Sequence, residues 1–157
     1  MKKRGAVEKA LSLLAVRART ELELERALAR AGLEEADRNA ALARLRELGY
    51  MDDREVARGR ARTLMERGEG PLLLARRLQS QGIAQEDAQA AVAEARGEVG
   101  DDELAARALQ RRLRGRKPRD VAEKRRLLRS LIAKGHKPGA AARALEMEWE
   151  GDEEIDP

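Results

Sequence analysis

Leucine and alanine recur every three or four residues along most of this chain, and no segment shows the two-residue alternation of a half-buried strand. The clearest pattern is L-x3-L-x3-G, which occurs three times, with starting points 50 and 53 residues apart. Its copies are Leu24, Leu28 and Gly32, then Leu74, Leu78 and Gly82, then Leu127, Leu131 and Gly135. Leucines four residues apart share a helix face, and glycine ends a helix readily because it tolerates the left-handed conformation. The pattern therefore predicts three helices that each end in a glycine turn.

Apolar residues at helical spacing also flank each copy. The upstream sets are Ala10, Leu11 and Leu14, then Ala57, Ala61 and Leu64, then Ala106, Leu109 and Leu113. The downstream pairs are Ala41 and Leu42, then Ala91 and Val92, then Ala144 and Leu145. Each copy thus predicts a helix, a loop, a second helix, a glycine turn and a third helix. We expect an all-α fold, a tandem array of three three-helix repeats that is elongated or curved, because so small a unit is marginal alone.

The repeats predict the domain organisation of the chain. The first repeat occupies residues 1–51 and includes a short basic N-terminal segment, the second occupies 52–100, and the third occupies 101–147. Residues 148–157 are acidic and show no helical apolar pattern, so we expect a disordered tail there.

Capping residues stand where several of these helices should begin. Thr20 with Glu23, and Asp120 with Glu123, have the spacing of a capping box. Carboxylates also stand at the start of the first helices of the second and third repeats, where they would cap free N–H groups and favour the helix dipole. These are Asp52, Asp53, Asp101 and Asp102. We favour capping over acid–base or metal chemistry for such pairs.

Composition narrows the possible classes of protein. Aromatic residues make up 1% of the chain, with one Tyr, one Trp and no Phe, so the core is built from aliphatic contacts between helices. There is no Cys, which excludes disulfides and thiolate metal sites and fits a reducing cytoplasm. The lone His136 has no companion ligands at metal-binding spacing, and Tyr50 is interpreted as a packing residue after Gly49. No apolar run approaches the roughly 20 residues that span a bilayer, so we expect a cytoplasmic protein without cofactor, metal or membrane contact.

Charge is distributed unevenly. The whole chain carries +4, but seven acidic and no basic residues lie from Glu146 to Pro157, which leaves +11 for residues 1–145. A basic body indicates a polyanionic partner or an acidic protein surface. The densest cluster comprises Arg111, Arg112, Arg114, Arg116, Lys117, Arg119, Lys124, Arg125 and Arg126. Guanidinium groups suit phosphates and carboxylates alike, so this cluster either contacts DNA backbone or an acidic surface, or is an ordinary solvated linker.

Arg76 and Arg77 form a smaller second candidate, for which a solvated helix face is the favoured interpretation. Single-strand binders usually stack bases on several aromatics, and neither Tyr50 nor Trp149 lies in a basic segment. Phosphate-binding loops, nucleophile elbows and glycine-rich dinucleotide turns are absent from the sequence, so we expect no enzymatic activity.

The ordered set of motifs resembles the RecX family of regulatory proteins over roughly residues 6–147. The opening runs from Ala10 through Thr20 and Glu23 to Leu33, and the most distinctive segment is Gly49-Tyr50-Met51-Asp52-Asp53. Gly70-Pro71, followed by Leu78 and Gly82-Ile83, is similar to the central repeat of the family. The chain departs from the family at Val56 and His136, where RecX proteins often have an aromatic residue.

The resemblance implies a helical array that lies along the RecA–single-stranded DNA filament and limits recombinase activity in DNA repair and recombination. It implies RecA as the partner, single-stranded DNA as a further contact, and a monomer without catalysis. Two alternatives stay open. The glycine turns between helices would suit a helix-turn-helix DNA-binding protein or transcription regulator, and the repeats would suit a helical scaffold with another partner.

Overall fold

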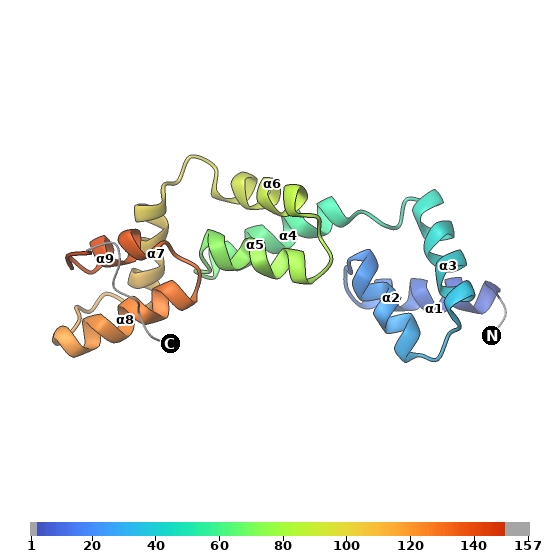
Figure 1. Cartoon of the computed structure of the whole chain (residues 1–157), viewed down its shortest axis with the longest axis horizontal. Coiled ribbons are helices and arrows are strands. Elements are labelled where there is room, and N and C mark those ends of the chain that lie inside the picture. The colour runs from blue at the N-terminus through green and yellow to red at the C-terminus, as the bar shows by residue number, and fades with distance from the viewer. Residues whose placement is uncertain (1–2, 150–157) are drawn as a thin grey trace.

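The computed structural model of the chain describes residues 3–149, and within that range it contains nine helices and no strand (Figure 1). In chain order they are α1 (Lys3–Val16), α2 (Glu21–Arg30), α3 (Glu35–Glu47), α4 (Asp53–Glu66), α5 (Pro71–Ser80), α6 (Gln85–Arg96), α7 (Asp101–Leu113), α8 (Val121–Ala133) and α9 (Pro138–Ala144). The prediction of an all-α repeat array is confirmed. The expected disorder of the acidic tail falls mostly on residues 150–157, which lie outside the described residues.

The array is elongated, with α1–α3 at one end, α4–α6 in the middle and α7–α9 at the other end (Figure 1). Each triplet of helices encloses a hydrophobic core of its own, so the described residues form three separate buried clusters. The leucines of the repeated motif are central to these cores. They are Leu24 and Leu28, Leu74 and Leu78, and Leu127 and Leu131, all buried. The predicted repeat boundaries stay a prediction, and they fall in the loops 48–52 and 97–100.

The glycine turns form as expected. Gly32, Gly82 and Gly135 have φ angles of 83°, 93° and 92°. In each turn the following residue donates its N–H to the carbonyl of the second motif leucine, at 3.2 Å from Leu33 N to Leu28 O in the first repeat. The chain thereby reverses after the second helix and lays the third helix against the same core.

The predicted N-caps at Thr20, Asp52 and Asp120 all accept a backbone N–H of their helix, but only Thr20 completes a capping box. Thr20 forms a complete capping box with Glu23, and Asp52 accepts the N–H of Glu55 at 3.1 Å. Asp120 accepts the N–H of Glu123 at 2.7 Å, but Glu123 turns its carboxylate to the N–H of Arg119, so only half a box forms.

Asp101 and Asp102 begin α7 as predicted, but they do not cap its N–H groups, so the capping part of the prediction is wrong. Gly100 occupies the cap position, and the two carboxylates instead pair with the side chains of Lys137 and Arg143. Asp101 contacts Lys137 at 2.7 Å, and Asp102 contacts Arg143 at 2.7 Å. Both pairs tie α7 to α9 within the third repeat.

The first and second repeats meet through the start of α2 and the glycine turn after α5. The Thr20 hydroxyl donates to the carbonyl of Gln81, and a Cβ on Gly82 would lie 2.5 Å from the Cβ of Leu22. Arg60 of α4 reinforces this joint, since its guanidinium lies 2.7 Å from a Glu23 carboxylate oxygen. Burial alone would raise the pKa of Glu23, but the hydrogen bonds from Arg60 and from the Thr20 N–H outweigh it and lower the pKa. The joint is polar, and no hydrophobic cluster of the described residues crosses it.

The second and third repeats meet through the equivalent elements. Gly70, at the start of α5, donates its N–H to the carbonyl of Lys134 at 2.7 Å. Leu72 donates its N–H to the carbonyl of Gly135 at 3.1 Å. The backbones approach so closely that a Cβ on Gly70 would lie 2.3 Å from the Gly135 carbonyl carbon. One rule therefore builds both joints: the second helix of a repeat begins on the glycine turn of the next repeat.

The two ends of the array differ from its joints. No helix start among the described residues packs on the Gly32 turn of the first repeat, and a Cβ there would meet nothing within 4 Å. At the other end, the second helix of the last repeat starts earlier relative to its motif. Its N-cap, Asp120, stands seven residues before Leu127, whereas Thr20, the N-cap of α2, stands four residues before Leu24. The second helix of the last repeat is thus one turn longer.

Candidate polyanion-binding surface

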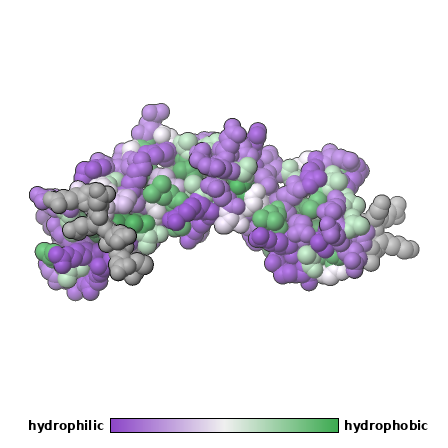
Figure 2. Space-filling view, in the orientation of Figure 1, coloured by the Kyte–Doolittle hydropathy of each residue, from purple (hydrophilic) through white to green (hydrophobic). Residues whose placement is uncertain are grey.

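The third repeat holds most of the positive charge of the body. Residues 101–145 contain 14 Lys and Arg residues against 5 Asp and Glu residues, a net charge of +9 out of the +11 for residues 1–145. The space-filling view shows hydrophilic side chains over much of each repeat, with smaller apolar areas between them (Figure 2). What distinguishes the third repeat is therefore the size of its net positive charge.

The predicted basic cluster lies where α7 ends and α8 begins. Arg111 and Arg112 occupy the last turn of α7, and Arg114 is its left-handed C-cap, with a φ angle of 51°. The remaining members follow in the α7–α8 loop and the first half of α8. They are Arg116, Lys117 and Arg119 in the loop, and Lys124, Arg125 and Arg126 in α8. Apart from the half-buried Lys124 these side chains are exposed, so the structure gathers the cluster on one corner of the repeat.

Two members of the cluster hold the fold together. The two terminal guanidinium nitrogens of Arg116 donate to the two carboxylate oxygens of Glu123, at 2.6 and 3.1 Å. The Arg116 hydrogen bond, followed by that of the Arg119 N–H, lowers the pKa of Glu123 to about 2. Arg111 donates across the second joint to the carbonyl of Glu66. We therefore assign structural roles to Arg116 and Arg111.

The other seven members form no ion pair with any residue in the described range 3–149. The sequence-based list also omitted Arg129, which is exposed on α8 and likewise makes no ion pair there. It stands four and three residues after Arg125 and Arg126, on the face of α8 opposite the buried Leu131. Helical spacing alone could have included it.

Arg76 and Arg77 form a separate group on α5 of the second repeat. Arg77 pairs with Glu69 at 2.6 Å, whereas Arg76 is exposed and makes no ion pair with a described residue. The structure does not include these two residues in the corner between α7 and α8. Arg76 instead borders an apolar groove between α5 and α6.

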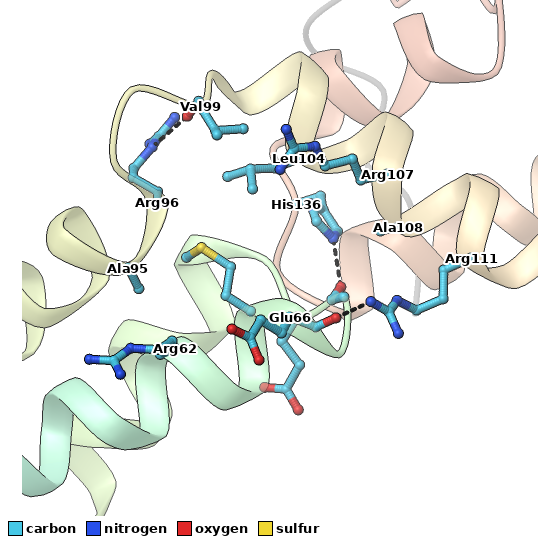
Figure 3. A pocket seen from close by; sticks show the side chains of 13 residues that line it. Arg62, Glu66, Ala95, Arg96, Val99, Leu104, Arg107, Ala108, Arg111 and His136 are labelled. Carbon is cyan, nitrogen blue, oxygen red and sulfur yellow. Dashed lines mark hydrogen bonds between the residues drawn. The ribbon is translucent and has the colours of Figure 1, made fainter.

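A cavity of about 280 Å³ at the second joint contains four arginines in its lining, but they do not converge (Figure 3). Arg96 binds the carbonyl of Val99 at 3.0 Å, Arg111 binds the Glu66 carbonyl, and Arg62 points away from the cavity. A single anion would meet no shared set of donors there. The cavity is therefore a gap at the interface between the second and third repeats, and we assign it no ligand.

His136 lines this cavity and links the second and third repeats. Its side chain is buried, and its Nε2 donates to the carbonyl of Gly68 at 2.9 Å, which requires a proton on that nitrogen. Burial is the main cause that lowers its pKa, and Lys134 lowers it further. The histidine is a structural residue.

Tyr50 corrects a second expectation. We interpreted it as a packing residue, but it is 57% exposed. The Gly49 turn bonds the Tyr50 N–H to the carbonyl of Leu45 at 2.9 Å, which ends α3 before the ring can reach the core. Among the described residues, no group of three or more His, Cys, Asp or Glu could hold a metal, and no helix there is long and apolar enough to cross a membrane.

The fold and this surface define a class: a three-helix repeat protein with polar joints and an unpaired basic corner on its last repeat. Within that class, the first three-helix domain of RecX matches residues 6–45 and the second three-helix domain of RecX matches residues 52–92. The chain belongs to the RecX family.

Relatives agree with this assignment over most of the chain. It is 33% identical to a regulatory protein RecX of Stenotrophomonas maltophilia (strain R551-3), over 88% of this chain and 83% of that protein. It is 32% identical to regulatory protein RecX of Vibrio parahaemolyticus, over 91% of each. A crystal structure of regulatory protein RecX has a TM-score of 0.70 at 22% identity, covering 92% of this chain and 71% of the other. RecX from Lactobacillus salivarius has a TM-score of 0.68 at 21% identity, covering 92% and 94%.

Proposed function

We propose that this chain is a non-enzymatic regulator of RecA that binds the RecA–single-stranded DNA filament and inhibits its recombinase and ATPase activities. Membership of the RecX family supports the regulatory role. The observation that carries the mode of binding is the net charge of +9 on the third repeat, with most of its basic cluster free of ion pairs among the described residues. An exposed, unpaired guanidinium can bind a phosphate or a carboxylate without first breaking an internal contact.

The elongated shape supports the same proposal. A chain of three repeats offers a long surface, which suits a filament of repeated subunits better than a compact target (Figure 1). The polar joints let each repeat contact a different part of such a filament. The basic corner of the third repeat would then contact DNA backbone or an acidic part of RecA.

The direct test is single-stranded-DNA-dependent ATP hydrolysis by the cognate RecA, with this protein titrated at substoichiometric ratios. We expect a progressive fall in hydrolysis, and the stoichiometry separates capping of filament ends from coating along the filament. No effect at excess protein would overturn the proposal.

A charge-matched pair of variants locates the contact. The first changes Arg112, Arg125, Arg126 and Arg129 to Ser, and leaves Arg111 and Arg116 in place because they support the fold. The control changes four exposed arginines of the first two repeats that form no ion pair with a described residue: Arg26, Arg30, Arg62 and Arg67. We expect at least about a tenfold weaker inhibition by the first variant and a shallower salt dependence of filament binding. Equal losses in both variants would show that only total charge matters.

A further inference from the structure

The groove between α5 and α6 combines an apolar floor with a basic rim. It has a volume of about 650 Å³, with Leu72, Ala75 and Val92 on the floor and Arg76, Arg96 and Lys137 on the rim. Leu72 is 46% exposed, although Leu74 and Leu78 of the same helix are core residues. We call this site the α5–α6 groove. An apolar side chain flanked by carboxylates matches its chemistry.

The rim keeps a positive charge. Arg96 and Lys137 both contact the single carboxylate of Asp101, at 2.9 and 2.7 Å, so this trio retains one net positive charge. Arg76 adds a second, since it pairs with no described residue. An anionic segment is therefore favoured over a neutral or basic one.

The last described residues pack on α9 and the third core, and Lys137, the N-cap of α9, belongs to the groove rim. Glu146 adopts a left-handed conformation with φ 54°, and the Met147 N–H returns to the carbonyl of Ala142 at 2.9 Å. Trp149 packs on the third core, and its Cδ1 lies 3.8 Å from the position of a Cβ on Gly139, in the first turn of α9. Lys137, two residues before Gly139, is part of the groove rim. Residues 150–157 thus follow Trp149, which lies against the start of α9, and Lys137 at that start borders the α5–α6 groove.

Residues 150–157 have the composition that the groove requires. They hold five carboxylates and one large apolar residue, Ile155, which stands between Glu154 and Asp156. Eight extended residues reach up to about 28 Å, at roughly 3.5 Å per residue. Attachment beside the site also raises the local concentration of the segment to about the millimolar range.

We propose that residues 150–157 dock in the α5–α6 groove, with Ile155 on its apolar floor and the neighbouring carboxylates facing Arg76 and Lys137. The docked segment covers Arg76 and adds negative charge next to the basic third repeat. Building on the proposed function, the segment is an internal competitor for the anionic partner. A partner with higher local charge displaces it.

Engineered cysteines test the docking without any partner, because the chain has no Cys of its own. The test variant combines Leu72→Cys with Ile155→Cys, and the control combines Leu48→Cys with Ile155→Cys. Leu48 is also 46% exposed, but it lies in the first repeat. A disulfide needs Cα atoms within about 7 Å, so we expect intramolecular cross-linking at least about tenfold faster in the test variant, read by non-reducing electrophoresis and mass spectrometry.

Two results would overturn the docking: equal cross-linking rates in both variants, or cross-links only between chains at micromolar concentration. Adding Arg76→Glu should slow cross-linking, whereas adding Arg26→Glu should leave it unchanged.

The competitive role has its own measurement. The oxidised test variant should bind single-stranded DNA filaments of RecA more weakly than its reduced form, and equal binding would refute the competition. Loss of filament binding by both forms would count against the proposed function instead.

Discussion

Two glycines with opposite surroundings show how single residues set the packing of this chain. Gly70 starts α5, where a Cβ would lie 2.3 Å from the Gly135 backbone. Gly59 lies in the middle of α4, where a Cβ would meet nothing within 4 Å. The first glycine is required by the joint between repeats, and the second only weakens its helix.

Alanine substitutions at these two positions should therefore change stability in opposite directions. Gly70→Ala should lower the free energy of unfolding by about 1–3 kcal/mol, because two backbones must separate. Gly59→Ala should raise it by about 0.5–1 kcal/mol through helix propensity. Thermal and urea unfolding followed by circular dichroism measures both, and a stable Gly70→Ala variant would contradict the close approach.

The Glu123 carboxylate predicts how the third repeat responds to acid. Arg116 and the Arg119 N–H hold its folded pKa at about 2, below the ordinary value of 4.5. A lowered carboxyl pKa gives stability that is complete above about pH 4.5 and is lost as the pH falls toward 2. Unfolding by urea at pH 5 and pH 3 should show this loss.

Glu123→Gln should be less stable than the native chain at pH 5 and should lose less stability on acidification. Glu98→Gln, which removes an exposed carboxylate from the α6–α7 loop, is the matched control and should keep the native pH dependence. If Glu123→Gln keeps the full pH dependence, other carboxylates are responsible for it.

At the scale of helices, the N-cap residues differ in how much they do. Asp52 only caps α4, whereas the buried Thr20 caps α2 and also donates to the carbonyl of Gln81 in the next repeat. Asp52→Ala should cost about 1 kcal/mol, as an ordinary cap does. Thr20→Ala should cost about 1 kcal/mol more, since a hydrogen bond across the joint is lost as well. Thr20→Ser keeps the hydroxyl and should fall between the native chain and Thr20→Ala in denaturant unfolding, and equal costs for all three would contradict the joint.

Helices and their turns could be predicted from the sequence because their causes are local. The spacing from Leu24 to Leu28 and Gly32 contains both the buried face and the left-handed turn. The pairing of Asp101 with Lys137 could not be predicted, because it depends on how α7 and α9 meet after folding. For that reason local reasoning wrongly assigned the carboxylate to a helix cap.

The candidate surface was predictable in part for the same reason. A run of basic residues locates the cluster, and helical spacing extends it to Arg129. Sequence does not reveal that Arg116 is held by Glu123 or that Arg111 reaches the Glu66 carbonyl. It also cannot show that Arg76 borders an apolar groove, because that groove is formed by two helices.

At the scale of the whole molecule, three separate cores predict regional unfolding. Leu131→Ala, in the third core, should cost about 2–5 kcal/mol there. Because no hydrophobic cluster of the described residues crosses a joint, hydrogen exchange should accelerate in α7–α9 and stay unchanged in α1–α3. Leu28→Ala should give the mirror image, with faster exchange in α1–α3. Uniform acceleration in both variants would show a single cooperative unit.

The shared design of the two joints gives the array a direction, since a helix start always meets the turn of the following repeat. The Gly32 turn keeps the same shape, but no helix start in the described range 3–149 packs on it. An additional copy of residues 52–100, inserted between the first and second repeats, would find a matching contact on both sides. The separation between the N-terminal repeat and the basic corner would then grow by the length of one repeat for each inserted copy. Comparing the binding of such a series of chains would measure the spacing of binding sites on a partner filament.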